Sequence, residues 1–124
     1  MKWNLAWLVL LVAVLTGCST PPKQSPEEIL TGSWKPTGSV ALYKIAFVDG
    51  AVVVSGHSEY SGKRLAILEA DWNGEVLRFT SYMASTNTKV VHENRITGTD
   101  TMSSSIVENK TGRSRAHTVV WRKQ

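Results

Sequence analysis

Cysteine is nearly absent from this 124-residue chain, which holds Cys18 alone. A single thiol cannot form an internal disulfide, so the fold has to be held by its apolar core. Catalytic and metal motifs are also missing. The three histidines, His57, His92 and His117, are too dispersed for a zinc spacing, and no G-x-S-x-G nucleophile elbow occurs. We therefore expect no enzyme activity, no cofactor and no metal centre.

An apolar run occurs near the N-terminus, but it is too short to span a membrane as a helix. It extends over 13 residues, from Trp3 to Leu15, which as a helix cover about 20 Å of the ~30 Å hydrocarbon core of a bilayer. Lys2 precedes the run, and the small residues Thr16 and Gly17 follow it. This pattern predicts a signal peptide over residues 1–17, with a helical apolar segment.

The tetrad that ends this run, Leu15-Thr16-Gly17-Cys18, resembles the lipobox of bacterial lipoproteins. The resemblance implies that Cys18 carries a diacylglycerol thioether, becomes the first residue after cleavage, and is acylated on its amino group. Two or three acyl chains anchor a protein almost permanently. Ser19 stands where an aspartate in Gram-negative members favours inner-membrane retention. The resemblance thus implies the periplasmic face of the outer membrane, provided that the source is Gram-negative.

A tether and a short helical turn are expected over residues 18–30. Pro21 and Pro22 favour an extended chain after the lipid anchor. Ser25 is placed to cap a helix, with Pro26 at its first position and Glu28 completing a capping box. We expect this turn to continue through Leu30, before a separate domain over residues 31–124.

Regular turn signals divide this domain. Asp49-Gly50, Ser61-Gly62, Asn73-Gly74 and Thr97-Gly98 follow a spacing of twelve residues, the polar run 85–88 fills the missing position, and Thr111-Gly112 makes the last turn. The strand-like segments between them are 40–48, 51–60, 63–72, 75–84, 88–96, 99–110 and 113–123, with a short strand around Trp34. This spacing leaves no room for crossover helices, so we predict an all-β antiparallel meander of about eight strands. Closure into a small barrel removes the exposed edges, and a two-sheet sandwich is the alternative.

Alternation of apolar and polar residues predicts which side chains face the interior. The expected inward sets are Tyr43, Ile45 and Phe47; Ala66, Leu68, Ala70 and Trp72; Leu77, Phe79 and Met83; and Val90, His92 and Ile96. The segment 113–123 stays open, because Val119 and Trp121 share a face with Arg113 and Arg115. The polar segment 102–106 is interpreted as an edge or seam strand.

Gly32-Ser33-Trp34 at the first strand and Arg122 in the last strand together resemble the lipocalin and calycin superfamily of up-and-down barrels. The resemblance implies a cation–π contact between Trp34 and Arg122 at the closed end of the barrel. It also implies a small apolar ligand, for which we expect Trp34, Leu77, Phe79 and His92 as binding residues. A barrel with strands this short is expected to be filled rather than deeply hollow.

Two charged clusters have competing interpretations. The basic C-terminal residues are Lys110, Arg113, Arg115, Arg122 and Lys123, and the chain without Lys2 has a net charge of about +3. They favour either an ordinary solvated hairpin or a patch for anionic envelope surfaces. The cluster His57, Glu59, Glu69 and Asp71 is typical of cross-strand charges, with a divalent ion as the alternative. No aromatic and basic face for nucleic acid is evident.

The leading functional hypothesis is a lipid-anchored, non-enzymatic envelope protein that binds a small apolar molecule or an envelope protein. One alternative is an inhibitor of lysozyme-type enzymes, because Ser61-Gly62-Lys63-Arg64 is similar to the Ser-Gly-rich loop of such periplasmic inhibitors. The other alternative is a structural envelope component that uses the basic hairpin. The ligand, the partner and the oligomeric state stay open.

Overall fold

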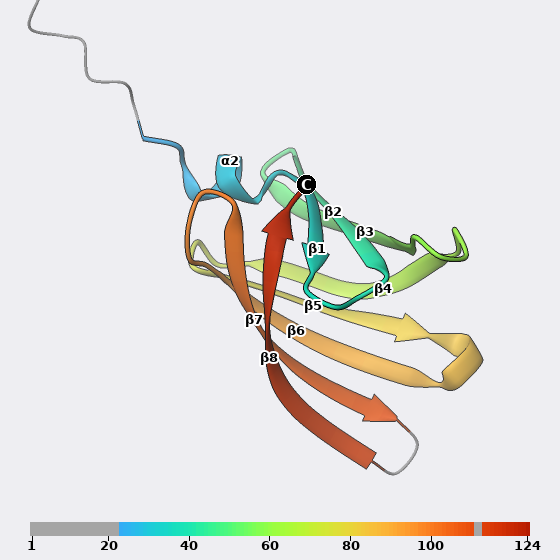
Figure 1. Cartoon of the computed structure of the whole chain (residues 1–124). Helices are drawn as coiled ribbons and strands as arrows, with labels where there is room; N and C mark the ends of the chain where they lie inside the picture. The colour runs from blue at the N-terminus through green and yellow to red at the C-terminus, as the bar shows by residue number, and fades with distance from the viewer. Residues whose placement is uncertain (1–22, 111–112) are drawn as a thin grey trace, which may run out of the picture.

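The computed structural model describes residues 23–110 and 113–124 (Figure 1). The expected signal peptide, the lipobox with Cys18 and the predicted turn at Thr111-Gly112 lie outside the described residues. Within the described part, no helix has the length and apolarity needed to cross a bilayer.

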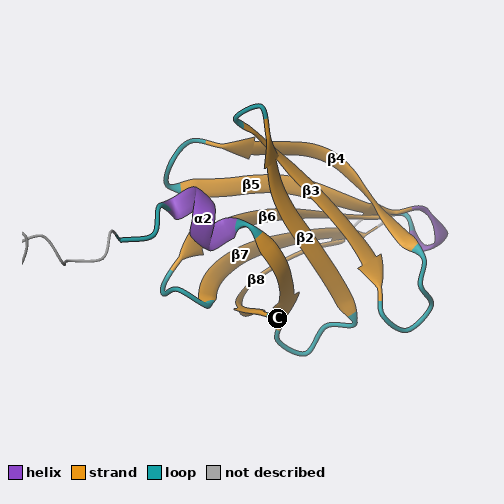
Figure 2. Ribbon diagram, turned by 90° about the horizontal axis from the view of Figure 1, so that it is seen from above, coloured by secondary structure: helices purple, strands orange, loops and turns teal. Residues whose placement is uncertain are grey.

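Eight antiparallel strands form a closed barrel, as the turn spacing predicted (Figures 1 and 2). In chain order the elements are α2 (Pro26–Leu30), β1 (Gly32–Pro36), β2 (Ala41–Val48), β3 (Ala51–Ser58), β4 (Arg64–Trp72), β5 (Val76–Met83), the 3₁₀ turn η1 (Ala84–Thr86), β6 (Thr88–Ile96), β7 (Thr101–Lys110) and β8 (Arg113–Lys123). Each strand pairs with the next, and β1 pairs with β8 through Trp34–Lys123, Lys35–Arg122 and Pro36–Trp121. This last ladder closes the sheet into a barrel.

The short helix α2 closes one end of the barrel, to the left in Figure 2. Ser25 caps it as predicted, accepting a hydrogen bond of 3.2 Å from the Glu28 amide, and Pro26 starts the helix. Leu30 is fully buried. Its carbonyl accepts a 2.8 Å hydrogen bond from the Trp34 indole. A single turn of helix is therefore enough to seal this end.

Two hairpin turns with similar sequences are stabilised in different ways. At Asp49-Gly50 both residues have positive φ, 51° and 78°, as a type I′ turn requires. At Asn73-Gly74 only Gly74 has positive φ, 93°. Here the Asn73 carboxamide oxygen accepts from the amides of Glu75 and Val76, at 2.9 and 2.8 Å. A side chain thus replaces part of the backbone turn.

The core is rich in aromatic residues and fills the barrel interior beneath α2. It consists of Leu30, Trp34, Tyr43, Ile45, Val54, Leu77, Phe79, Met102 and Trp121. The predicted inward faces of β2 and β6 are confirmed, with Tyr43, Ile45 and His92 buried. The face shared by Trp121, Arg113 and Arg115 in β8 is buried near one end of the strand and exposed near the other. Trp121 is buried in the core, and Arg113 and Arg115 on the same face are exposed near the opposite end of the strand.

The prediction for β4 is wrong over its first half, because the strand contains a bulge. The pairing with β5 shifts between Ile67 and Glu69, which leaves Leu68 as the extra residue. Ile67 consequently packs on the core, and Leu68 is 51% exposed. Ala66 likewise faces outward, opposite Tyr82. Beyond the bulge Ala70 and Trp72 pair with the inward residues Phe79 and Leu77, as the alternation predicted, and Trp72 packs against the core. Ala70, however, is exposed.

The interpretation of 102–106 as an edge or seam strand is also wrong. β7 pairs along its length with both β6 and β8. Met102 and Ser104 are fully buried. The Ser104 hydroxyl donates to the carboxamide oxygen of Asn94, a buried residue that shares the predicted inward face of β6 but was not in the expected set. A polar pair inside the barrel therefore explains why this interior strand has a polar sequence.

Candidate functional site

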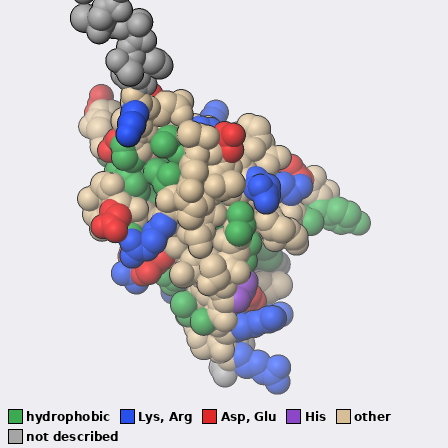
Figure 3. Space-filling view, turned by 60° about the vertical axis from the view of Figure 1, so that its left-hand side comes forward, with side chains coloured by type: hydrophobic (Ala, Val, Ile, Leu, Met, Phe, Trp, Pro, Cys, Tyr) green, Lys and Arg blue, Asp and Glu red, His purple; other side chains and the backbone are tan. Residues whose placement is uncertain are grey.

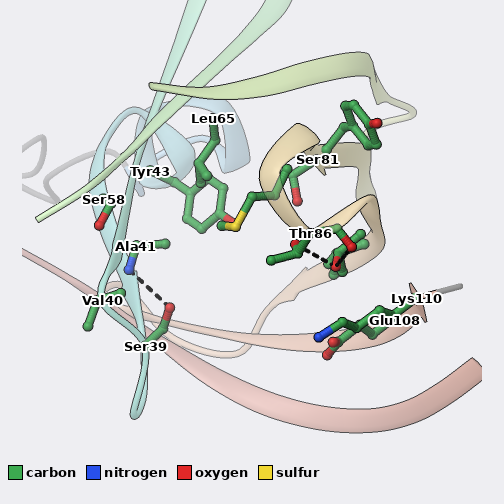
Figure 4. A pocket seen from close by; sticks show the side chains of 14 residues that line it. Ser39, Val40, Ala41, Tyr43, Ser58, Leu65, Ser81, Thr86, Glu108 and Lys110 are labelled. Carbon is green, nitrogen blue, oxygen red and sulfur yellow. Dashed lines mark hydrogen bonds between the residues drawn. The ribbon is translucent and has the colours of Figure 1, made fainter. Parts of the chain in front are cut away.

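The end of the barrel opposite α2 contains a cavity of about 340 Å³ (Figure 4). Its walls are built from strand ends and the adjoining turns. The lining residues are Ser39, Val40, Ala41, Tyr43, Ser58, Leu65, Ser81, Tyr82, Met83, Thr86, Thr88, Val90, Glu108 and Lys110. The meander brings these segments together, because alternate turns lie at the same end of an up-and-down barrel.

The cavity wall is apolar with hydroxyl groups distributed around it. Aliphatic and thioether groups come from Val40, Ala41, Leu65, Met83 and Val90, and hydroxyls come from serine and threonine. Some of these hydroxyls already have partners (Figure 4, dashed lines). Ser39 Oγ accepts from the Ala41 amide at 3.0 Å, and Thr86 Oγ1 lies 2.8 Å from Thr88 Oγ1. Such a lining suits a mainly apolar molecule with few polar groups.

Charged groups occur at the rim rather than deeper in the cavity. Glu108 and Lys110 come from the last residues of β7 and lie together in Figure 4. Lys110 is exposed and Glu108 is half-buried. The cavity therefore combines an apolar wall with a polar entrance.

Tyr43 and Ser81 contribute the most deeply buried part of the lining, with His92 behind them. Ser81 Oγ lies 3.1 Å from His92 Nε2. The His92 ring stacks on Phe79 at a centroid distance of 4.4 Å. Burial lowers the pKa of His92 to about 4, so the imidazole is neutral at physiological pH. Burial also raises the pKa of Tyr43, opposed by the Ser81 hydroxyl, so the phenol stays protonated.

A close backbone approach makes room for the Tyr43 ring. Gly56 is the cross-strand partner of Tyr43 in the β2–β3 ladder and is buried. A Cβ at Gly56 would lie 3.0 Å from Tyr43 Cδ1, tighter than most real Cβ contacts, so the ring would have to shift. On its other face the ring stacks with Trp121 at 4.7 Å. The position of Tyr43 is thus fixed by packing.

The residues predicted to bind a ligand lie elsewhere. Trp34, Leu77 and Phe79 are buried in the filled part of the barrel and do not line the cavity. His92 does not line the cavity either; it lies behind two lining residues, with a hydrogen bond to Ser81 and an edge contact to the Tyr43 ring. The expectation of a filled barrel thus holds for the α2 end, and the hollow lies at the other end.

The cation over Trp34 is Lys123, not Arg122. Lys123 Nζ lies 5.6 Å from the Trp34 ring centroid and donates to the Ile29 carbonyl at 2.7 Å. Residues alternate along β8, and Trp121 faces the core, so Lys123 faces inward and Arg122 outward. Gly32 leaves space for the Lys123 stem, since a Cβ there would lie 3.0 Å from Lys123 Cε.

The cluster of His57, Glu59, Glu69 and Asp71 is dispersed in the structure. His57 pairs with Arg64 across the β3–β4 ladder. Glu59 forms a 2.7 Å ion pair with Lys35. Glu69 and Asp71 are opposite β5 residues instead. In residues 23–110 and 113–124 no group of three potential metal ligands is found.

Sequence reasoning identified Tyr43 as inward-facing but missed the cavity as a site. Ser58, Ser81 and Thr88 line the cavity, yet each appears in the sequence as an ordinary polar strand residue. One available signal was their position, since each lies close to a turn at the same end of the meander. Alternation alone does not distinguish an open end from a closed one.

Comparison with known proteins adds a likeness of fold. No protein-family model matches this chain, and no curated protein matches it. Among solved structures, Tp0751 (pallilysin) of Treponema pallidum resembles it with a TM-score of 0.49 and 11% sequence identity over 94% of each chain. A likeness of this size carries no inference about a ligand or an activity of this chain.

Proposed function

We propose that this chain is a lipid-anchored cell-envelope protein whose barrel binds a small, mainly apolar molecule without transforming it. The apolar cavity at the open end is the observation that supports this proposal. Its volume of about 340 Å³ falls at the lower end of the range for small-molecule sites, roughly 300–1,000 Å³. The ligand is therefore small and enters past the rim formed by Glu108 and Lys110.

The proposed ligand has an apolar body and one neutral polar group. The aliphatic wall favours the apolar body through burial, at about 25 cal/mol per Å². The Tyr43 phenol and the Ser81 hydroxyl are buried, and a deep ionised group would be costly beside them. A ligand hydroxyl or carbonyl that reaches this pair would orient the molecule.

A photoreactive apolar probe tests the cavity in the full chain held in lipid nanodiscs. Benzophenone abstracts hydrogen efficiently beside thioether sulfur, and Met83 lines the cavity. We expect a cross-link at Met83 that Val90→Trp, which fills the cavity, reduces about tenfold, equivalent to about 1.4 kcal/mol of binding. The matched control is Leu68→Trp, because Leu68 is exposed outside the cavity. Equal labelling of Met83 in both variants would reject the site.

The membrane anchor is tested separately at Cys18. We expect the chain to incorporate radiolabelled palmitate and to fractionate with outer membranes, and Cys18→Ser to abolish both, since the resemblance places the acyl groups on that residue. Palmitate incorporation that persists in Cys18→Ser would contradict the assignment. This result would leave the cavity experiment unaffected.

Inhibition of a lysozyme-type enzyme is the second candidate function, and one observation favours it. Ser61, Gly62 and Lys63 are exposed between β3 and β4, as is Arg64 at the start of β4, and the adjoining Tyr60 is 92% exposed. A protruding loop of this kind fits into an enzyme cleft more readily than a flat sheet does. Lysozyme should be inhibited by the wild-type chain and less by Lys63→Ala, with Lys44→Ala as the control. Absence of inhibition by the wild-type chain ends this alternative.

A further inference from the structure

The last strand lacks a neighbour along most of one edge. β8 pairs with β7 from Arg113 to Arg122. With β1, however, it pairs only at Trp121, Arg122 and Lys123. Figure 1 shows β7 and β8 continuing together past the end of β1. Among the described residues, no strand pairs with this edge of β8 over 113–119.

Three terminal contacts determine which backbone groups face the free edge. On the β1 side, the Val120 carbonyl accepts from the Thr37 amide at 2.9 Å, and the Gln124 amide donates to Ser33. On the β7 side, the Lys123 amide donates to Asp100. Backbone groups alternate sides along a strand, so even-numbered residues of β8 face the β1 side. Ser114, Ala116 and Thr118 therefore direct their N–H and C=O groups to the free edge.

The side chains beside this edge are predominantly basic on one face. Arg113 and Arg115 share the face of Trp121 and are exposed. Across the β7–β8 ladder they are opposite Lys110 and Glu108. Within the described residues neither arginine lies within 4.0 Å of a carboxylate; the ion pairs that form lie on other strands. Three cations thus accompany one anion around the free edge. Figure 3 shows Lys and Arg side chains projecting from the lower part of the molecule.

We propose that the free edge of β8, over Arg113–Val119, binds an extended acidic peptide segment of another protein as an added antiparallel strand. The added strand would continue the line of β1 and pair with the backbone groups of Ser114, Ala116 and Thr118. Its alternate side chains would then lie directly opposite Arg113 and Arg115, where carboxylates are favoured. This surface adjoins the cavity rim, because Glu108 and Lys110 line the cavity and are opposite Arg115 and Arg113.

A second copy of the same chain is a poorer occupant of this edge. Antiparallel pairing of two β8 edges around Ala116 would place Arg113 and Arg115 of both copies on one face. Like charges at adjacent and diagonal positions destabilise such a ladder, and basic residues at an edge act against self-pairing. The same charges attract an acidic strand.

A pair of synthetic peptides tests strand addition directly. The first alternates threonine and glutamate over seven residues. The second is identical but N-methylated at its threonines, whose amides face β8 when the glutamates lie opposite Arg113 and Arg115, so it keeps the charge and loses the donors on that edge. Fluorescence anisotropy with the full chain in zwitterionic nanodiscs should show binding of the first peptide. N-methylation of this edge should weaken binding about tenfold or more, because it removes the backbone hydrogen bonds that the peptide would donate to Ser114, Ala116 and Thr118. Equal binding of both peptides would overturn the proposal in favour of charge alone.

Hydrogen exchange resolved to single amides gives a signature that charge attraction does not produce. The bound peptide should slow exchange at Ser114, Ala116 and Thr118. The amides of Arg115 and His117 should change little, because they already face β7. Uniform protection along β8, or none, would contradict strand addition.

Variants separate the backbone contribution from the charge contribution. Ala116→Pro removes one edge donor and is compatible with an edge strand, and it should weaken peptide binding about fivefold. The double variant Arg113→Glu and Arg115→Glu should weaken binding about tenfold, since attraction becomes repulsion. The double variant Lys44→Glu and Lys89→Glu, at exposed positions of β2 and β6, is the control with the same change of charge and should bind as wild type. Far-UV circular dichroism verifies that each variant is folded.

Two further outcomes would overturn the proposal. If phosphatidylglycerol vesicles bind the chain through Arg113 and Arg115 and neither peptide does, the basic face serves a membrane. If Ala116→Pro instead abolishes a dimer seen by light scattering, the edge serves a second copy.

Discussion

At the scale of single residues, His92 is the group whose burial has the clearest consequence. It is 3% exposed and stacked on Phe79, with Ser81 as its hydrogen-bond partner. A charged imidazole in this place would lose its hydration without gaining an anionic partner. The folded chain therefore holds His92 neutral, with a pKa of about 4 against 6.5 for the ordinary group.

This pKa difference predicts loss of stability in mild acid. Above pH 6.5 the group is neutral in both states and contributes no pH dependence. Between pH 6.5 and 4 the unfolded chain binds a proton that the folded chain does not, so the free energy of unfolding falls, by about 2–3 kcal/mol at pH 4.5. Urea unfolding at pH 7 and 4.5 should show a smaller fall for His92→Gln than for wild type. His117→Gln, at an exposed position, should behave as wild type; an equal fall in all three proteins would contradict the assignment.

At the scale of an element, β4 shows how one extra residue reverses the faces of a strand. The sequence of β4 alternates well enough to predict Leu68 inside, and the bulge places Ile67 there instead. A bulge places two residues of one strand opposite one residue of its neighbour. Side chains before the bulge therefore point to the opposite face from the one that simple alternation with those after it would give. The register of β4 on β5 therefore decides the face, not the alternation within β4.

Substitution at two neighbouring positions tests this register. Leu68→Ser should change the free energy of unfolding by less than about 0.5 kcal/mol, because the side chain is already exposed. Ile67→Ser should cost about 1–3 kcal/mol, because it removes apolar contact with the core and places a hydroxyl there. Chemical unfolding measures both values. A larger loss at Leu68 than at Ile67 would support the regular strand and reject the bulge.

At the scale of the whole molecule, the two ends of the barrel differ in how they are packed. The α2 end is filled by Leu30, Trp34 and Lys123, which are linked through hydrogen bonds to the Ile29 and Leu30 carbonyls. The other end holds the cavity and the free edge of β8. The filled α2 end thus holds together the strands whose other ends carry both proposed binding surfaces.

The seal at the α2 end predicts a large contribution from a residue outside the barrel strands. Leu30→Ala should lower the free energy of unfolding by about 2–4 kcal/mol, because it leaves a cavity beneath α2. Val120→Ala, on the exposed side of β8, is the control and should cost less than about 0.5 kcal/mol. Urea unfolding followed by near-ultraviolet circular dichroism measures both. Equal effects would mean that α2 does not seal the core.

Features that depend on neighbouring residues were predictable, and those that depend on distant ones were not. The cap at Ser25, the turn at Asp49-Gly50 and the inward Tyr43 follow from local backbone geometry and alternation. The cation over Trp34 was assigned to Arg122 and is Lys123, because the pairing of the two chain ends decides it. The cavity was missed for the same reason: its walls come from both halves of the chain.

The sequence alone determined the all-β class, the eight-stranded antiparallel meander and most of its turns, because each depends on residues a few positions apart. Only the tertiary structure decided which end is open, where β4 shifts its register and which residues meet around the cavity. Closure of the barrel pairs β1 with β8, at opposite ends of the domain. No periodicity within a strand carries the register of such a distant pair.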